Sequence, residues 1–443
     1  MSNPTTASVR EFTRRVILAT TVIWSISRAL HASRVWSDVP SLDSPDANIS
    51  VSPFCFAKEV TDSISIPSEI RIHDTTLREG EQTPGVVFSP QDKLAIARKL
   101  DQVGIQQIES GFPVASQGER MAVRLIAREG LEARIFGFAR AVPSDIEAVA
   151  ECDAFGVVLS FPPSDIHLKY KLKMTRKEYL AKAVQAVELA KKHGLYVTYS
   201  AEDSTRADLD FLKRIFNEIA RAGANTVRVV DTVGAITPLA MRYLVREIRK
   251  AVDIPVEIHC HNDHGLALAN TLAALEEGAS VISSSIDGLG ERAGLAATEE
   301  IIITLHNLYG IRSFNTKSLF ELCKLVENLS RIKISPNKPV VGENVFAHTT
   351  GIHQHGVLEN PTTYESYPPE LVGRERSLLL GKLSGTHAVV HKLHALGYNA
   401  SREKVTEVLA AVKEMSEKRR SALSDSEFAE IAQQVLKKRK DES

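Results

Sequence analysis

The sequence has few cysteines, and none of them are closely spaced. Only four of its 443 residues are cysteine, and no C-x-x-C pair occurs; they are Cys55, Cys152, Cys260 and Cys323. Proteins with a disulfide framework are dense in cysteine, and structural zinc sites use closely paired cysteines. The scattered cysteines exclude such a framework and indicate reduced thiols in a protein of the cytosolic type.

The sequence also lacks an excess of either charge and a long apolar run. Lysine and arginine number 54 against 55 acidic residues, a net charge of −1, so there is no basic surplus of the kind that nucleic-acid-binding proteins use. The apolar stretch from Val16 to Leu30 contains Arg28 and is shorter than the roughly 20 residues that cross a bilayer. We therefore expect no nucleic-acid partner and no membrane partner.

The first 65 residues differ in composition from the rest. Residues 1–36 carry arginines at several positions against a single acid, Glu11, and residues 37–65 are rich in serine, aspartate and proline, as in a linker. An arginine-rich, serine-rich and acid-poor segment is typical of an organelle transit peptide, but a disordered extension has the same composition. Residues 1–65 are interpreted as an N-terminal extension, disordered or targeting, of a protein that is otherwise expected in the cytoplasm.

From residue 70 onward, short β-branched runs alternate with helical patterns. Eight runs recur over about 220 residues at the spacing of a β/α unit. They span residues 70–77, 107–112, 133–139, 154–161, 195–203, 226–232, 255–263 and 280–288. One intervening helical pattern begins at Arg176 and ends at Gly194, a residue suited to the position after a helix. The pattern predicts a (β/α)₈ TIM barrel over residues 66–335, and amphipathic patterns predict a small α-helical C-terminal subdomain within 336–443.

Polar side chains follow the apolar runs where each predicted strand ends. They are Asp74, Glu109, Arg140, Ser160, Glu202, Asp231, His259, His261 and Asp287. In a barrel, the carboxyl ends of all strands form one face, and active sites lie there. A helix cap explains any one of these residues. The complete set predicts a catalytic mouth.

Two histidines within one predicted strand suggest a metal site. His259 and His261 are two residues apart, which sends both imidazoles to the same face of a strand. Glu79 follows the first strand, and the first and last strands are neighbours in a closed barrel. Two imidazoles and one carboxylate are a common set of ligands for a divalent metal, which here is Zn, Mg or Mn.

The stretch "HDTTLREGEQTPGV", which contains Glu79, has further polar residues at this end of the barrel. Arg78 is placed to stabilise a developing oxyanion. Asp74 is expected to orient Arg78 or a ligand histidine, and Gln82 to donate to a substrate carboxylate. The alternative for Arg78 is a structural ion pair with Asp74.

Four stretches resemble one enzyme family. "DTTLREGEQTPGV", "EIHCHNDHGLALANT", "GLGERAG" and "FAHTTGIHQHGV" occur in the order found in the 2-isopropylmalate synthase and homocitrate synthase family. The resemblance runs from about Ile70 to about Gln434. It implies a metal-dependent acyltransferase of amino-acid biosynthesis that condenses acetyl-CoA with a 2-oxo acid, with Glu79, His259 and His261 as metal ligands.

The resemblance also implies roles for the other site residues. Arg78 matches the arginine that polarises the oxo group, and Glu202 matches a glutamate near the reacting methyl group. His353 matches a histidine proposed as general base, and Tyr364 matches a tyrosine beside it. In relatives these last two reach the barrel of a partner subunit, so a homodimer with shared active sites is implied.

Two positions depart from the family pattern. Leu295 follows "GERAG" where relatives often have an asparagine that approaches the metal, and Leu383 in "GKLSG" stands where relatives usually have histidine. Homocitrate synthases often lack the asparagine too. Since leucine cannot bind a metal, three protein ligands are expected.

The resemblance is nearest to homocitrate synthases of the nitrogen-fixation and methanogen type. "STRADLDFL" and "ELVGRERSLLLGK" are similar to theirs, and the long C-terminal regulatory domain of most leucine-pathway synthases is missing. The expected 2-oxo acid is therefore 2-oxoglutarate, with Arg140 for its distal carboxylate and Thr232 for its 1-carboxylate. A surface ion pair is the alternative role of Arg140, and 2-oxoisovalerate and pyruvate remain open as substrates. Hydroxymethylglutaryl-CoA lyases share the metal motifs, but they carry a cysteine-bearing, glycine-rich loop that this sequence lacks.

Overall fold

The computed structural model describes residues 49–437, which separate into two compact units. One unit comprises residues 52–333, and the other comprises residues 49–51 and 334–437. The sequence-based interpretation of the extension up to residue 48 lies outside the described residues. Two short helical turns precede the barrel: Pro53–Phe56 (η1) and Lys58–Thr61 (α2).

The first unit is the predicted TIM barrel. Eight parallel strands close into a ring in the order β1 to β8. Their bounds are β1 Arg71–Asp74, β2 Gln107–Gly111, β3 Arg134–Arg140, β4 Gly156–Ser160, β5 Tyr196–Ala201, β6 Thr226–Asp231, β7 Val256–Cys260 and β8 Val281–Ser284. Each falls within or next to a predicted run, so the fold prediction is confirmed.

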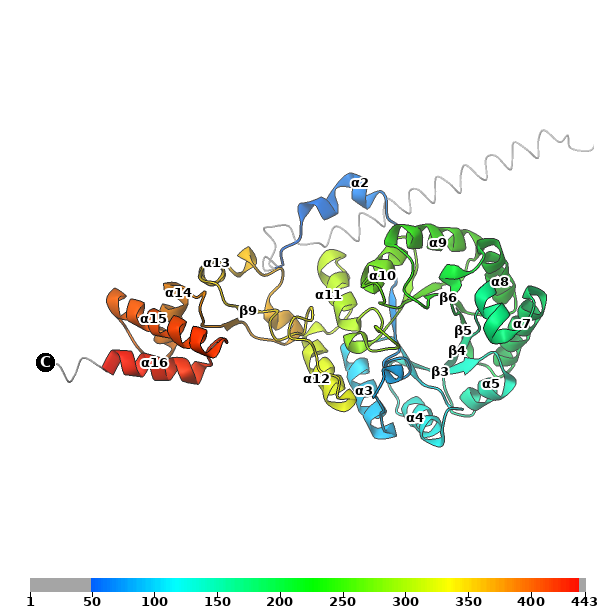
Figure 1. Cartoon of the computed structure of the whole chain (residues 1–443). Coiled ribbons are helices and arrows are strands. Elements are labelled where there is room, and N and C mark those ends of the chain that lie inside the picture. The colour runs from blue at the N-terminus through cyan, green and yellow to red at the C-terminus, as the bar shows by residue number, and fades with distance from the viewer. Residues whose placement is uncertain (1–48, 438–443) are drawn as a thin grey trace, which may run out of the picture. The chain divides into compact units, whose positions relative to one another are not determined.

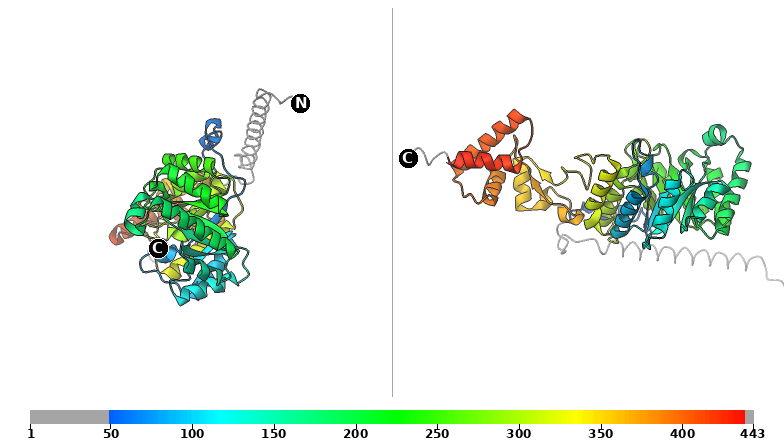
Figure 2. Two further views of the ribbon diagram at one scale, coloured as in Figure 1. Left: turned by 90° about the vertical axis from the view of Figure 1, so that its right-hand side faces the viewer. Right: turned by 90° about the horizontal axis from the view of Figure 1, so that it is seen from below.

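Helices surround the ring of strands, as Figures 1 and 2 show. They are α3 Pro90–Val103, α4 Gln117–Ala127, α5 Pro143–Ala150, α7 Arg176–Lys192, α8 Leu209–Arg221, α9 Pro238–Ala251, α10 Ala267–Leu275, α11 Thr298–Leu308 and α12 Leu319–Ser330. Their buried faces are mainly apolar, as in α8, where Phe211, Leu212, Ile215, Phe216 and Ile219 are buried. The helices therefore cover the outer face of the barrel and shield it from water.

Local chemistry fixes where the elements begin and end. Helix α7 begins after Thr175, which forms a capping box with Glu178, and it ends before Gly194, whose φ is +78°. The first strand ends at Asp74, three residues earlier than predicted, because the carbonyl of Thr75 accepts the N–H groups of Arg78, Glu79 and Gly80. This turn directs the following residues toward the mouth of the barrel.

The second unit is mainly helical. It contains α13 Gly351–Glu359, α14 Thr386–Ala395, α15 Arg402–Arg419 and α16 Asp425–Lys437, with a two-stranded parallel sheet of β9 Ala347–His348 and β10 Ser377–Leu378. The last three helices share a core that includes Leu393, Val408, Val412 and Phe428. Among residues 49–437, no helix is both long and apolar enough to span a bilayer.

A glycine in β4 tests the packing of the barrel interior. A Cβ added at Gly156 would lie 2.6 Å from Cε1 of Phe136 and 2.7 Å from the carbonyl oxygen of Tyr196. We expect Gly156→Ala to lower the free energy of unfolding by about 1–3 kcal/mol, the usual cost of overpacking. Urea denaturation followed by circular dichroism measures this.

The matched control is Gly118→Ala on the exposed side of α4. Its added Cβ would have its nearest contact at 3.6 Å, with Oγ of Ser116. Because alanine is favoured over glycine in a helix, this variant should be neutral or more stable than the unsubstituted protein. Equal stability of the two variants would show that the interior accommodates a methyl group at Gly156.

Candidate active site

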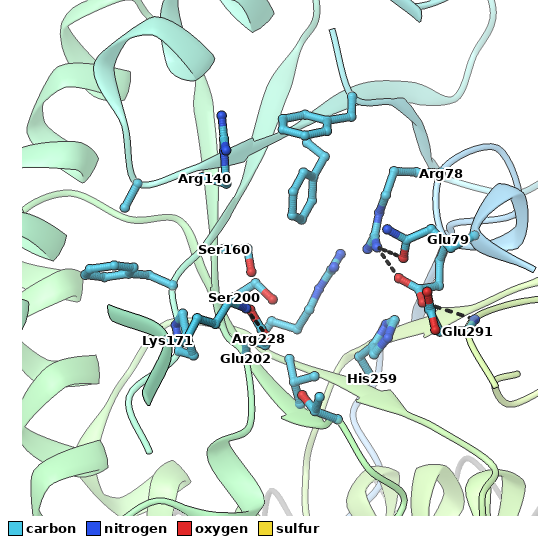
Figure 3. Close-up of a pocket in the computed structure, with 18 of the residues that line it drawn as sticks. Arg78, Glu79, Arg140, Ser160, Lys171, Ser200, Glu202, Arg228, His259 and Glu291 are labelled. Carbon is cyan, nitrogen blue, oxygen red and sulfur yellow. Dashed lines mark hydrogen bonds and ion pairs between the residues drawn. The ribbon is translucent and has the colours of Figure 1, made fainter. Parts of the chain in front are cut away.

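A cavity opens at the carboxyl ends of the barrel strands. Its volume is about 460 Å³, and Figure 3 shows Arg78 and Glu79 on one side and Lys171 and Glu202 on the other. All the predicted site residues of the barrel line it: Arg78, Glu79, Gln82, Arg140, Glu202, Thr232, His259 and His261. The structure thus brings together side chains from five of the strands and their following loops.

Glu79, His259 and His261 converge in this cavity. Each is buried, and each offers one ligand atom within 4.8 Å of those of the other two. The Nε2 atoms of the histidines are 3.4 Å apart, and Nε2 of His261 is 3.8 Å from Oε1 of Glu79. The imidazoles come from β7, which pairs with β8, and β8 pairs with β1, which leads into Glu79.

The protonation state of these imidazoles suits a metal. Burial lowers the pKa of both, and the pKa of His259 lies well below its usual value, with His261 and nearby arginines adding to the effect. Nδ1 of His259 is 2.9 Å from Oγ of Ser283. The tautomer that donates this hydrogen bond leaves the Nε2 lone pair facing Glu79 and His261. Two neutral imidazoles and a carboxylate therefore fit a divalent cation.

The loop after β8 holds Glu79 in place. The backbone N–H of Glu291 donates to Oε1 of Glu79 at 3.4 Å. Leu295, at the position where the family often has asparagine, is buried and pairs with His261 through a backbone bridge. A Cβ at Gly290 would touch both Leu295 Cγ, at 3.2 Å, and Glu79 Cγ, at 3.4 Å. Leu295 thus lies beside the three converging side chains and offers them no ligand atom.

Arg78 is oriented by a buried carboxylate. Its Nε donates to Oε1 of Glu109 at 2.5 Å, its Nη1 contacts Glu79, and its guanidinium lies 4.7 Å from the ring centre of Phe138. Glu109 also accepts from Arg228 at 3.2 Å. Burial would raise the pKa of Glu109, but the two arginines lower it to about 2. An ionised Glu109 therefore fixes Arg78 at the wall of the cavity.

The prediction for Asp74 is wrong. Its carboxylate accepts from the N–H of Thr76 and the hydroxyl of Thr298, both at 2.9 Å, and burial raises its pKa to about 6. Successive side chains of a strand alternate between faces. Since His73 points into the barrel interior, Asp74 points outward to the helices. Glu109 takes the expected role toward Arg78, so the structural ion pair between Arg78 and Asp74 is not formed either.

The remaining predicted residues lie around the rim. Both carboxylate oxygens of Glu202 contact Nζ of Lys171, at 2.7 and 2.9 Å. Oγ1 of Thr232 accepts from the N–H of Asp203 at 2.7 Å. The side-chain amide of Gln82 satisfies its hydrogen bonds when its nitrogen donates to the two carboxylate oxygens of Glu79, at 2.9 and 3.1 Å.

Arg140 forms a surface ion pair with Asp145, which was the alternative role considered for it from the sequence. Its Nε and Nη2 donate to the two oxygens of Asp145, at 2.7 and 3.0 Å, and its side chain is 62% exposed at the edge of the cavity. The pKa of Arg140 is raised by this pairing. The guanidinium is therefore a permanent cation at the rim.

Sequence reasoning missed three cations that line the cavity: Lys171, Arg228 and Arg292, the last of which forms an ion pair with Asp263. Arg228 lies on β6 with 1% exposure, held by Glu109 and by Glu257, whose Oε1 is 2.6 Å from Nη2. A lone arginine within the apolar run "TVRVVDT" was a visible signal of an inward charge. Lys171 comes from the turn Leu168–Leu172 (η3) after β4, a position with no local sequence signal.

His353 and Tyr364 belong to the second unit. Their rings lie 4.1 Å apart and both residues are exposed on that unit. Helix α13, which carries His353, is anchored by Gln354, which donates to the carbonyls of His348 and Leu379. A Cβ at Gly356 would lie 2.7 Å from the Tyr364 ring, so glycine makes this packing possible. Leu383 is 60% exposed on the same unit.

Comparison with known families gives two matches. Residues 69–326 match the family model described as HMGL-like. Residues 340–420 match the model described as homocitrate synthase post-HMGL domain-like. The first match covers the barrel and the second covers most of the helical unit.

Curated relatives extend over nearly the whole described chain. A homocitrate synthase of Methanopyrus kandleri is 49% identical over 87% of this chain and 97% of its own length. A 2-isopropylmalate synthase of Methanocaldococcus jannaschii is 44% identical over 86% of this chain and 74% of its own length. The crystal structure of hydroxymethylglutaryl-CoA lyase from Pseudomonas aeruginosa shares the barrel fold, with a TM-score of 0.56 and 22% identity over 61% of this chain and 95% of that chain. The chain therefore belongs to the HMGL-like family, with the homocitrate and 2-isopropylmalate synthases among its relatives.

Proposed function

We propose that this protein condenses acetyl-CoA with 2-oxoglutarate to give homocitrate and CoA. Membership of the family makes it an enzyme of the acyltransferase type. The single observation that carries the proposal is the convergence of Glu79, His259 and His261 beside Arg78. The four cysteines, all within the described residues, form no disulfide bond, which supports our proposal of a reducing, cytoplasmic location.

The convergent side chains would hold a divalent metal, Zn, Mg or Mn. When bound, such an ion supplies a Lewis acid that polarises the 2-oxo group of the substrate. Arg78 donates to the oxo oxygen and stabilises the negative charge that develops there. Its fixed orientation on Glu109 and Phe138 supports this role, because a preorganised donor needs no rearrangement during the reaction.

Two polar side chains suit the carboxylate next to the oxo group. Since the hydroxyl oxygen of Thr232 accepts from the N–H of Asp203, its own proton is available to a ligand. The amide group of Gln82 lines the same cavity and can also donate to that carboxylate. Together they would hold the 1-carboxylate of the 2-oxo acid.

Carbon–carbon bond formation requires a base. The imidazole of His353 takes a proton from the methyl group of the acetyl thioester, and the resulting carbanion attacks the oxo carbon. Glu202 would lie near the reacting methyl group, and Tyr364 supports His353 through contact between their rings, whose centres are 4.1 Å apart. Water then cleaves the thioester and releases CoA. We propose that His353 and Tyr364 act in the barrel of a second copy, in a homodimer.

Charge at the rim supports 2-oxoglutarate as substrate. Its distal carboxylate needs a cation, and Arg140 and Lys171 both line the cavity. Asp145 occupies Nε and Nη2 of Arg140, and Nη1 has no hydrogen-bond partner among the described residues. The similarity to the Methanopyrus homocitrate synthase adds further support.

The second candidate is 2-oxoisovalerate, the substrate of a 2-isopropylmalate synthase. Two observations favour it: the 44% identity to such a synthase and an apolar part of the cavity wall. That wall comprises Phe112, Phe138, Val142, Phe161 and Leu172. A panel of 2-oxo acids that includes pyruvate, scored by the CoA thiol released from acetyl-CoA, decides between the substrates.

Replacing His259 tests the metal site. His259→Ala removes one of three donor atoms, so we expect loss of bound metal. CoA release should fall by more than about 100-fold, because losing a residue that only orients a ligand already costs about 10-fold to 100-fold. Metal content per chain and a thiol assay measure the two effects, with circular dichroism to verify folding. The control His193→Ala, at an exposed position after α7, should change neither. A folded His259→Ala protein that keeps its metal and turnover would refute the assignment.

Mixing inactive variants tests the shared site. His259→Ala damages the barrel and His353→Ala damages the helical unit, so a mixed dimer has one intact site of two. Co-expression should restore about a quarter of normal activity if subunits pair at random. The control pair His259→Ala with Glu79→Ala, both in the barrel, should stay inactive. No recovery in the first pair would mean that His353 does not act across a dimer.

Replacing Arg140 tests the substrate. Arg140→Ala should raise KM for 2-oxoglutarate by about 10-fold to 100-fold, the worth of a hydrogen bond to a charged group. The KM for 2-oxoisovalerate should change little, since that acid has no distal carboxylate. Arg128→Ala, which removes an exposed ion pair with Asp153, is the control. Equal losses for both acids would exclude Arg140 as the selecting residue.

A further inference from the structure

Lys93 is a buried cation outside the cavity. It lies on α3 with 0% exposure, and its Nζ contacts carboxylates from two different segments. Oε2 of Glu81 is 2.6 Å away, and Oε1 of Glu119 forms a second ion pair. A buried ammonium group is retained only where its partners compensate for the lost hydration. Its two partners lead to two different loops at the mouth of the barrel.

Glu81 connects Lys93 to the loop after β1. This residue stands in the turn Gly80–Gln82 (η2), two positions after Glu79. Its other oxygen, Oε1, accepts the N–H of Phe88 at 2.7 Å, which ties the start of the turn to the residues just before α3. Lys93 therefore restrains the loop that carries Arg78 and Glu79.

Glu119 connects Lys93 to the loop after β2. Its Oε2 accepts the N–H of Phe112 at 2.9 Å, and Phe112 lines the cavity. The preceding residue, Gly111, has a φ of +152°, and a Cβ there would lie 2.5 Å from Oε2 of Glu119 and 3.3 Å from Nζ of Lys93. A side chain at position 111 would displace the ion pair, so the backbone is shaped around it.

Phe138 of β3 bridges the same two loops at the mouth. The ring of Phe112 packs edge-on against Phe138 with centroids 5.1 Å apart. The guanidinium of Arg78 lies over the Phe138 ring, 4.7 Å from its centre. Lys93 thus holds the loops at one end, and the stack of Phe112, Phe138 and Arg78 holds them at the other.

We propose that Lys93 is a positioning residue that sets the loops after β1 and β2, and through them the placement of Glu79 and Arg78 in the cavity. The inference rests on the proposed function for its effect on metal binding and turnover. Its effect on the loops themselves does not depend on that function.

The test is Lys93→Met, which keeps a long apolar side chain and removes the charged Nζ group. We expect metal affinity and kcat to fall by about 10-fold to 100-fold, as for other groups that orient metal ligands. Hydrogen exchange should rise in segments 78–90 and 110–116, while the barrel strands stay protected. Lys99→Met, on the same helix, removes only an outer ion pair with Glu321 and should leave every readout unchanged.

A second variant separates positioning from general stability. Lys93→Met leaves two carboxylates without their cation, so Lys93→Met with Glu81→Gln and Glu119→Gln removes the stranded charges. This triple variant should recover the thermal midpoint but keep the fast loop exchange and the weak metal binding.

The outcomes are distinct. Unchanged loop exchange in Lys93→Met, full recovery of metal affinity in the triple variant, or failure of the triple variant to fold would each overturn the proposal. If the unsubstituted protein binds no metal, the proposed function fails, and loop exchange in the metal-free protein still decides the role of Lys93.

Discussion

Closure of the barrel between β1 and β8 is the constraint on which the site depends. Residues Arg71–Asp74 pair with Val281–Ser284, and β8 pairs in turn with β7. This closure brings Glu79, near the start of the barrel, to the imidazoles of His259 and His261 near its end. An open sheet with the same strands would leave the carboxylate and the imidazoles at distant positions, and no common ligand could reach all three.

The barrel interior below the mouth is built from charges as well as from apolar side chains. His73, Glu109, Arg228 and Glu257 are each at most 1% exposed. Nδ1 of His73 is 3.2 Å from Oε1 of Glu257, and Arg228 links Glu257 to Glu109. Buried ion pairs are weak sources of stability, since desolvation opposes their attraction. Their value here is orientation, because the network ends at Arg78 and fixes its guanidinium at the cavity wall.

Periodicity made the fold and the convergent residues predictable from sequence. Eight apolar runs specify the strands, and a spacing of two places His259 and His261 on one face. The same alternation, applied to the first strand, would have turned His73 inward and Asp74 outward, so the error at Asp74 was avoidable. Lys171 and Lys93 could not be found in this way, because their roles arise from contacts with Glu202, Glu81 and Glu119 across separate loops. The residues next to each lysine in the sequence do not indicate contacts of this kind.

The similarity to the lyase and the similarity to the synthases cover different shares of the chain. The likeness to a hydroxymethylglutaryl-CoA lyase covers 61% of the chain and is a likeness of fold. Similarity to the synthases covers 87%, and residues 340–420 match a domain model of their own. The segment that the synthases add to the barrel is the one that carries His353 and Tyr364. A barrel that holds a metal and polarises a carbonyl can serve cleavage or condensation, and our proposal places the base for condensation, His353, in the segment that matches the synthase domain model.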